Sequence, residues 1–125
     1  MESRIIDAIN NAEKILIVTH TGPDGDAVGS AFGFKRLIMN NFEAKFVDVC
    51  ADGDISSLYS PMLRDNVINP TEMFEKYDLA IVLDCPNLAR TGKFKEVIEA
   101  APQIINIDHH GTNERFGTIN YATSV

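Results

Sequence analysis

The chain has 125 residues and a formal net charge of −7, and 45% of its residues are hydrophobic and 23% charged. This composition excludes a disordered chain, and the acidic balance excludes a protein that binds duplex DNA through a basic surface. The two cysteines form no CxxC pair and no apolar run approaches the roughly 20 residues of a membrane span, so we expect one cytoplasmic domain that binds no membrane.

Apolar patterning predicts alternating helices and strands from the first residues onward. Residues 4–12 carry isoleucines at helical spacing, and Ser3 is the expected cap. Residues 14–20, KILIVTH, form a short continuous apolar run, which is typical of a strand buried on both faces. Helical periodicity returns over residues 26–40, and residues 44–50, AKFVDVC, are expected to form the second strand.

The second half of the chain continues this alternation. Further expected elements, in chain order, are a brief strand near Val67, a helix over residues 70–77 that begins at Pro70 and Thr71, a strand over residues 78–85, a helix over residues 93–100 and a last clear strand over residues 103–108. Alternating strands and helices indicate a mostly parallel sheet with helices on both faces. The expected fold is therefore an α/β, Rossmann-like three-layer sandwich.

Polar side chains suited to hold a metal follow three of the predicted strands. They are His20, Asp24, Asp26, Asp84, Asp108, His109 and His110. In a parallel sheet the carboxyl ends of the strands meet at one edge, where ligands bind. Mixed imidazole and carboxylate ligands suit divalent manganese, iron, cobalt or zinc, and the oxygen-rich balance favours manganese. Because so many acids would repel one another without cations, we expect two metal ions that activate water for attack on phosphorus.

Each motif taken alone also has a purely structural interpretation. Residues 20–30, HTGPDGDAVGS, fit a capped turn between a strand and a helix, with Asp26 at the helix start. Asp84 would then cap the turn that follows it, and Arg90 would be an exposed charge rather than an anion ligand. The adjacent His109 and His110 are harder to explain in this way, because two imidazoles are costly to bury without partners.

Three motifs in this order and spacing resemble the amino-terminal domain of the DHH phosphoesterase superfamily. The motifs are HTGPDGDAVGS at 20–30, LDCPNLARTG at 83–92 and NIDHHGTNERFG at 106–117. The resemblance covers nearly the whole chain. The stretch DGDAVGS is most similar to the branch that acts on oligoribonucleotides and on 3′-phosphoadenosine 5′-phosphate. The resemblance thus implies a hydrolase that acts as an exonuclease (an oligoribonuclease) or a nucleotide phosphatase.

The resemblance also implies a role for each residue of the motifs. The implied metal ligands are His20 and Asp24 for one ion, Asp26 and His109 for the other, and Asp84 bridging the two. The implied catalytic residues are His110, which would face the substrate phosphate, and Asp108, which would orient the metal-binding His109. His110, Arg90, Asn113 and Arg115 are the expected substrate-binding residues.

One departure from the family pattern concerns the end of the chain. Family members carry a further metal-binding aspartate downstream and then a second domain that grips the substrate, whereas this chain ends at Val125. We therefore expect residues 1–125 to be a DHH catalytic domain truncated before these parts, with weak or no activity alone. The expected partner is a short single-stranded RNA, a product of a cyclic dinucleotide or a nucleotide. The sequence leaves a homodimer open.

Two other functions remain as alternatives. One is a manganese-dependent inorganic pyrophosphatase, and the other is a non-catalytic fragment that binds a nucleotide or a metal. A Rossmann-like cofactor binder is disfavoured, because no GxGxxG motif follows the first strand.

Overall fold

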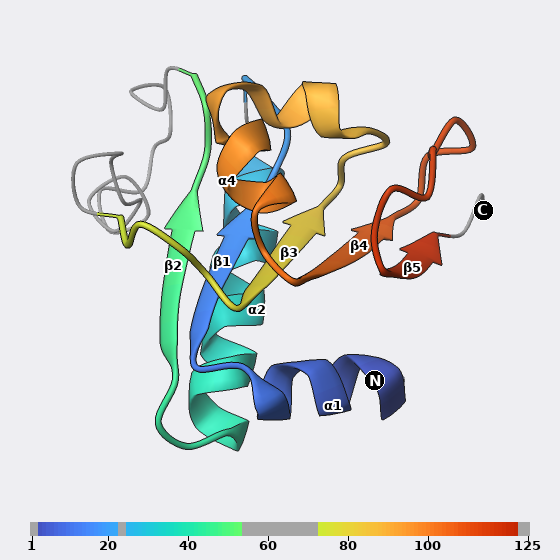
Figure 1. Ribbon diagram of the computed structural model, residues 1–125. Helices are drawn as coiled ribbons and strands as arrows, with labels where there is room; N and C mark the ends of the chain where they lie inside the picture. Colours follow the sequence, from blue (N-terminus) through green and yellow to red (C-terminus); the bar gives the residue numbers. More distant parts are fainter. Residues whose placement is uncertain (1–2, 23–24, 54–72, 123–125) are drawn as a thin grey trace.

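A single parallel sheet forms the centre of the molecule. The computed structural model describes residues 3–22, 25–53 and 73–122. The strands are β1 (Lys14–Val18), β2 (Phe46–Cys50), β3 (Leu79–Leu83), β4 (Gln103–Asp108) and β5 (Ile119–Ala122). They pair in the order β2-β1-β3-β4-β5, and every pairing is parallel. All carboxyl ends therefore lie along one edge, as the direction of the arrows in Figure 1 shows.

Helices cover both faces of this sheet. They are α1 (Ser3–Asn11), α2 (Gly25–Asn41), the 3-10 helix η2 (Leu88–Phe94) and α4 (Lys95–Glu99). Figure 1 shows α2 behind the sheet and α4 in front of it. The predicted three-layer α/β sandwich is confirmed. Within the described residues, no helix is both long and apolar enough to cross a membrane.

The continuous apolar runs follow from this double cover. In β1, Ile15 and Ile17 belong to the core cluster that includes α1 and α2. Leu16 and Val18 point the other way and join the cluster that contains Phe94 and Ile98 of η2 and α4. Because successive side chains of a strand alternate between faces, a strand covered on both sides needs apolar residues at every position.

One of the predicted elements differs from the structure in the middle of the chain. The four strands predicted within the described residues and the first two helices end within two residues of their predicted bounds. Residues 73–77 of the predicted helix over 70–77, however, are not helical. The Tyr77 hydroxyl donates to Asp48 Oδ2 at 2.7 Å, and the Phe74 N–H donates to that hydroxyl at 3.3 Å. The buried tyrosine therefore holds this segment as an irregular turn against β2. Val67, Pro70 and Thr71 lie outside the described residues.

The last strand, β5, was not predicted from the sequence. It is four residues long and sits at the edge of the sheet, with Tyr121 half exposed, so it carries no long apolar run. Its register is held by Thr118, whose hydroxyl accepts from the Ile104 N–H and donates to the Ile104 carbonyl, both at 2.9 Å. Pairing of this kind depends on a partner strand and leaves little signal in the segment itself.

A kink at Gly92 joins the loops that follow β1, β2 and β3. Gly92 has φ 65 and ψ −130 within η2, a conformation that side chains other than glycine's rarely adopt. A Cβ atom there would clash with Asp52 Oδ2 and lie 2.7 Å from Thr21 Cγ2. The same Asp52 carboxylate accepts a hydrogen bond from the Lys93 N–H at 2.9 Å. Glycine therefore lets three loops meet at the carboxyl edge of the sheet.

We predict that Gly92→Ala lowers the free energy of unfolding by about 1–3 kcal/mol, because the alanine is strained and pushes Asp52 off the Lys93 amide. Urea unfolding followed by circular dichroism measures the change. Gly33→Ala is the matched control, since Gly33 lies in α2 with nothing near an added Cβ, and it should stabilise the chain by about 0.5–1 kcal/mol. Equal effects of the two substitutions would contradict the role of Gly92.

Candidate metal centre

Asp84 occupies the middle of the carboxyl edge, directly after β3. Its backbone has φ 55, in the left-handed region that aspartate and asparagine tolerate better than most residues. The Asp84 N–H donates to the Ile107 carbonyl at 2.9 Å, so the contact between β3 and β4 continues past the end of β3. This bond fixes the backbone of Asp84 beside the end of β4, while its side chain stays partly exposed.

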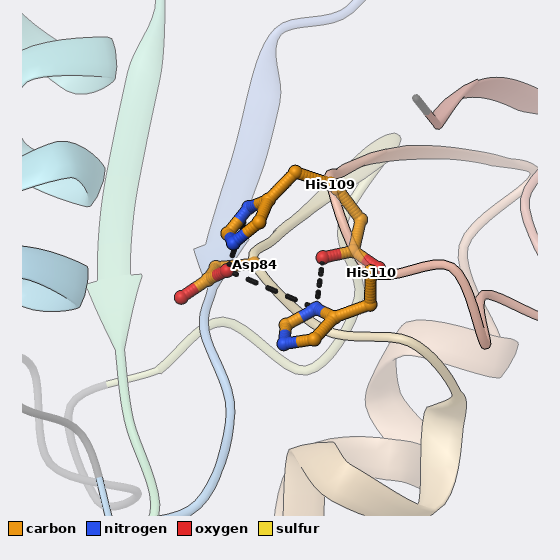
Figure 2. Close-up of side chains that lie close together, drawn as sticks. Asp84, His109 and His110 are labelled. Atoms are coloured by element: carbon orange, nitrogen blue, oxygen red, sulfur yellow. Dashed lines mark hydrogen bonds and ion pairs between the residues drawn. The ribbon is translucent and has the colours of Figure 1, made fainter. Parts of the chain in front are cut away.

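Two histidines face Asp84 from the end of β4 (Figure 2). Asp84 Oδ1 lies 3.2 Å from His109 Nδ1 and 3.9 Å from His110 Nδ1. The two rings stack on each other, with centroids 4.8 Å apart and planes inclined by 20°. Ligand atoms of Asp84, Asp108, His109 and His110 all lie within 4.8 Å of one another. These groups are close enough to share a bound cation.

His20 reaches the same carboxylate from the end of β1. Its Nδ1 lies 2.8 Å from the Thr21 carbonyl oxygen, which can only accept a hydrogen bond, so a neutral ring carries its proton on Nδ1. The Nε2 atom then has a lone pair and lies 3.7 Å from Asp84 Oδ2. Two lone-pair atoms that face each other repel, and a cation between them reverses the sign of the interaction.

Two buried polar atoms at this edge have no hydrogen-bond partner among the described residues. They are Thr19 Oγ1 and Asp84 Oδ1. The His109 ring nitrogen approaches Asp84 Oδ1 to 3.2 Å, but without the alignment that a hydrogen bond requires. An unpartnered buried oxygen is costly in a metal-free protein and is expected of a metal ligand. The donor set of imidazole nitrogen and carboxylate oxygen therefore fits a divalent transition metal.

Asp108 plays a different part from Asp84. Its side chain is fully buried, and Oδ1 lies 2.5 Å from His110 Nδ1. The other oxygen, Oδ2, accepts from Asn113 Nδ2 at 2.8 Å. Because the ionised carboxylate can only accept, the His110 proton lies on Nδ1, and Nε2 is left free. We predicted that Asp108 orients His109, but the ring that its side chain contacts is that of His110.

The hydrogen bonds to Asp108 also change its acidity. Burial works to raise the pKa of the Asp108 carboxyl, but the hydrogen bonds from Asn113 and His110 outweigh burial and hold the pKa below its usual range. Asp108 therefore stays ionised, and its negative charge is balanced by donors of the protein itself.

The other predicted site residues lie in several places. Asp24 is outside the described residues, and so is the side chain of Asp26, although Asp26 itself lies in the first turn of α2. Arg90 is exposed, and its carbonyl accepts from the Thr21 N–H at 2.6 Å. Arg115 is exposed as well, with φ 50. Contacts of these residues with a metal or a substrate stay predictions.

Asn113 is partly buried, and its side-chain amide is engaged by hydrogen bonds within the protein, so a contact with substrate stays a prediction. Its Nδ2 contacts Asp108 and Asn106, and its Oδ1 accepts from the Arg115 N–H at 2.7 Å. Sequence reasoning missed Asn106, which is completely buried in β4 and donates to the Val82 and Cys85 carbonyls at 3.3 and 3.1 Å. The signal was the amide side chain of Asn106 between the isoleucines of the apolar strand QIINID. A buried amide needs partners, and here it links β4 to the end of β3.

Comparison with known proteins adds independent findings. A family model described as "DHH family, N-terminal domain" matches residues 14–124. The chain is 32% identical over 115 residues to a protein of Mycoplasma genitalium named "Bifunctional oligoribonuclease and PAP phosphatase NrnA", covering 90% of this chain and 35% of that protein. It is 34% identical over 107 residues to a protein of the same name from Thermus thermophilus, covering 85% of this chain and 31% of that protein.

A solved structure shows the same arrangement of the chain. The crystal structure of an exopolyphosphatase-related protein from Bacteroides fragilis superposes with a TM-score of 0.81 at 26% identity, covering 96% of this chain and 37% of that one. The chain thus spans about a third of the length of the curated relatives it matches, 35% and 31% in the two cases above.

We predict that the stabilising effect of Asp108 depends on pH. Since the pKa of Asp108 is lower in the folded chain, its contribution is fully present above the unfolded pKa of about 3.9 and is lost as the pH falls through the folded value. Asp108→Asn should therefore cost more than about 1 kcal/mol near neutral pH, and this cost should shrink below about pH 4. Urea unfolding of both chains with a chelator, at several pH values, measures the difference. A cost that does not vary with pH would contradict the assignment.

Proposed function

The chain belongs to the DHH family, and on that premise we propose that it hydrolyses phosphate esters at the site around Asp84, with two divalent metal ions, manganese above all. As substrates we propose short oligoribonucleotides and 3′-phosphoadenosine 5′-phosphate, in keeping with the names of the two similar proteins. The observation that carries the proposal is the Asp84 carboxylate, which has histidine rings on two sides and one buried oxygen without a hydrogen-bond partner.

The charge of the site supports a metal-dependent reaction. The chain carries a net charge of −7, and within the described residues no lysine or arginine lies within ion-pair distance of Asp84 or Asp108. A phosphate ester would meet two carboxylates at this edge and be repelled. When bound, a divalent metal polarises the phosphoryl oxygens and lowers the pKa of water, so that water can attack at neutral pH.

Residues of this chain then have distinct tasks. His20, Asp84 and His109 would hold the metal, together with Asp24 and Asp26 as the family resemblance implies. His110 holds its Nδ1 proton against Asp108 and presents Nε2 to the substrate. A protonated His110 ring would donate through Nε2 to a phosphoryl oxygen, while the Asp108 carboxylate stabilises the imidazolium. We further propose that the protein acts in the cytoplasm on single-stranded or mononucleotide substrates.

A second candidate is the hydrolysis of a phosphoanhydride, such as pyrophosphate or polyphosphate. The structural neighbour described as exopolyphosphatase-related favours it. The metal ligands and His110 would serve either reaction, because both place a phosphoryl group at the same edge. The substrate that the chain turns over distinguishes the two.

We predict that manganese raises the melting temperature of the chain and supports hydrolysis of a diribonucleotide or of 3′-phosphoadenosine 5′-phosphate. Asp84→Asn should lower both metal affinity and turnover by at least about 100-fold, more than the loss of an outer hydrogen-bond partner costs. Asparagine is chosen because it tolerates the left-handed backbone at this position. Calorimetric titration with manganese and a phosphate-release or chromatographic assay measure the two effects.

Asp78→Asn is the matched control for this experiment. Asp78 precedes β3 as Asp84 follows it, and its carboxylate accepts from the Glu13 and Lys14 N–H groups at 3.0 and 2.9 Å, at the opposite edge of the sheet. It should leave metal affinity unchanged. Turnover of pyrophosphate or polyphosphate alone would establish the second candidate. If Asp84→Asn changes neither manganese affinity nor the hydrolysis of any of these substrates, the proposal of a phosphoesterase site at Asp84 is wrong.

We predict that the adjacent histidines separate on mutation. His109→Ala should lower manganese affinity by about tenfold or more, because its Nδ1 faces Asp84 as expected of a metal ligand. His110→Ala should keep manganese affinity and lower kcat by about 10²–10⁴-fold, as expected for a lost proton donor. Metal titration and steady-state kinetics on both variants decide the matter. Loss of metal by His110→Ala with retention by His109→Ala would reverse the two roles.

A further inference from the structure

Asn106 is the first member of a hydrogen-bonded amide network, formed by Asn106 and Asn113, beneath the metal centre. It is completely buried, and its Nδ2 donates to the Val82 carbonyl at 3.3 Å and the Cys85 carbonyl at 3.1 Å. Val82 lies near the end of β3, and Cys85 directly follows Asp84. Since both amide protons are used there, the Asn106 Oδ1 atom must point away from β3, toward Asn113.

Asn113 continues this amide network, and its side-chain amide can take only one orientation. Its Nδ2 lies 2.7 Å from Asn106 Oδ1 and 2.8 Å from Asp108 Oδ2, and its Oδ1 accepts from the Arg115 N–H at 2.7 Å. A flipped amide would set its oxygen against the Asn106 oxygen and the Asp108 carboxylate. That arrangement would also leave the Arg115 N–H facing a donor. Hydrogen bonding therefore fixes the orientation of both side-chain amides.

We propose that Asn106 and Asn113 are positioning residues that fix the tautomer and the ring orientation of His110 through Asp108. Asn113 donates to Asp108 Oδ2 and thereby holds the carboxylate so that Oδ1 faces the proton on His110 Nδ1, at 2.5 Å. The tautomer and orientation follow from these contacts alone. Their value in catalysis rests on the proposed function, in which His110 Nε2 faces the substrate phosphate.

The same amide network sets the distance between Asp84, on one side of the site, and the histidine pair, on the other. Cys85, whose carbonyl accepts from Asn106, directly follows Asp84, and Asp108 directly precedes the histidine pair. The Glu114 N–H also donates to the Pro86 carbonyl at 2.8 Å, which ties the two loops a second time. Without the Asn113 amide, the buried Asp108 carboxylate can turn, and the His110 ring can flip so that either nitrogen faces the site.

The informative variant is Asn113→Ser. Its hydroxyl can still accept from the Arg115 N–H and so keeps the local turn, but it is too short to reach Asp108. Asn120→Ser is the matched control, because Asn120 also makes two short hydrogen bonds, to the Gly117 carbonyl and from the Gly117 N–H at 2.8 and 2.9 Å, without touching Asp108. Both variants leave every proposed metal ligand in place.

The readout is the ¹⁵N spectrum of the histidine rings in the metal-free chain at about pH 8, above the ordinary histidine pKa of about 6.5. We expect His110 to be the Nδ1–H tautomer in the unsubstituted chain and in Asn120→Ser. In folded Asn113→Ser we expect a mixture of tautomers, and in the loaded enzyme a fall in kcat of about tenfold or more at unchanged KM. An unchanged His110 tautomer in folded Asn113→Ser would overturn the proposal.

A measurement on the unsubstituted chain keeps the test decisive if Asn113→Ser fails to fold. The Asn113 side-chain amide protons should then exchange slowly with solvent, and fast exchange would overturn the proposal. The tautomer is measured without metal or substrate, so an inactive chain with the expected tautomers would refute the proposed function alone. A chain that loses the tautomer in Asn113→Ser but keeps its kcat would refute the catalytic part of the inference.

Discussion

Two carboxylates meet at the carboxyl edge of the sheet, and like charges at short range repel unless each finds a compensating partner. The fold compensates the negative charges of Asp108 and Asp84 in different ways. Asp108 is buried and receives its hydrogen bonds from His110 and Asn113, so the protein itself balances the charge. Asp84 is surrounded by ring nitrogens at 3.2 to 3.9 Å and keeps one oxygen without a hydrogen-bond partner. The charge of Asp108 is thus balanced inside the protein, while Asp84 has an oxygen that could bind a cation.

The layered core makes this division possible. Strands buried on both faces carry apolar side chains almost throughout, so polar groups concentrate where the strands end. Asn106 is the exception inside β4, and its amide is used to connect two strand ends. The Gly92 kink also connects segments at this edge, because it lets the loops of Thr21 and Asp52 approach each other closely. Close packing below the edge thereby limits the freedom of the side chains above it.

Much of the fold could be predicted from the sequence, because unbroken apolar runs and helical periodicity are local signals. The parallel topology then implied that His20, Asp84 and His109 share one edge, and the structure brings these three side chains together. The errors have a common physical origin. β5 depends on pairing with β4, and the segment before Tyr77 depends on a hydrogen bond to Asp48. These features depend on contacts between residues that are distant in the sequence, so a local sequence pattern does not predict them.

The strand order has a consequence for how the chain acquires its fold during synthesis. β1 is made early but lies inside the sheet, between β2 and β3, and β3 begins only at Leu79. Its second neighbour therefore arrives after a long stretch of chain, and the entropy of closing that loop slows sheet assembly. The described groups of the candidate metal centre come from the ends of β1, β3 and β4, so they are all present only once residues up to His110 have been synthesised. A metal bound at these groups would therefore stabilise strands that have already paired, and it could not guide their first pairings.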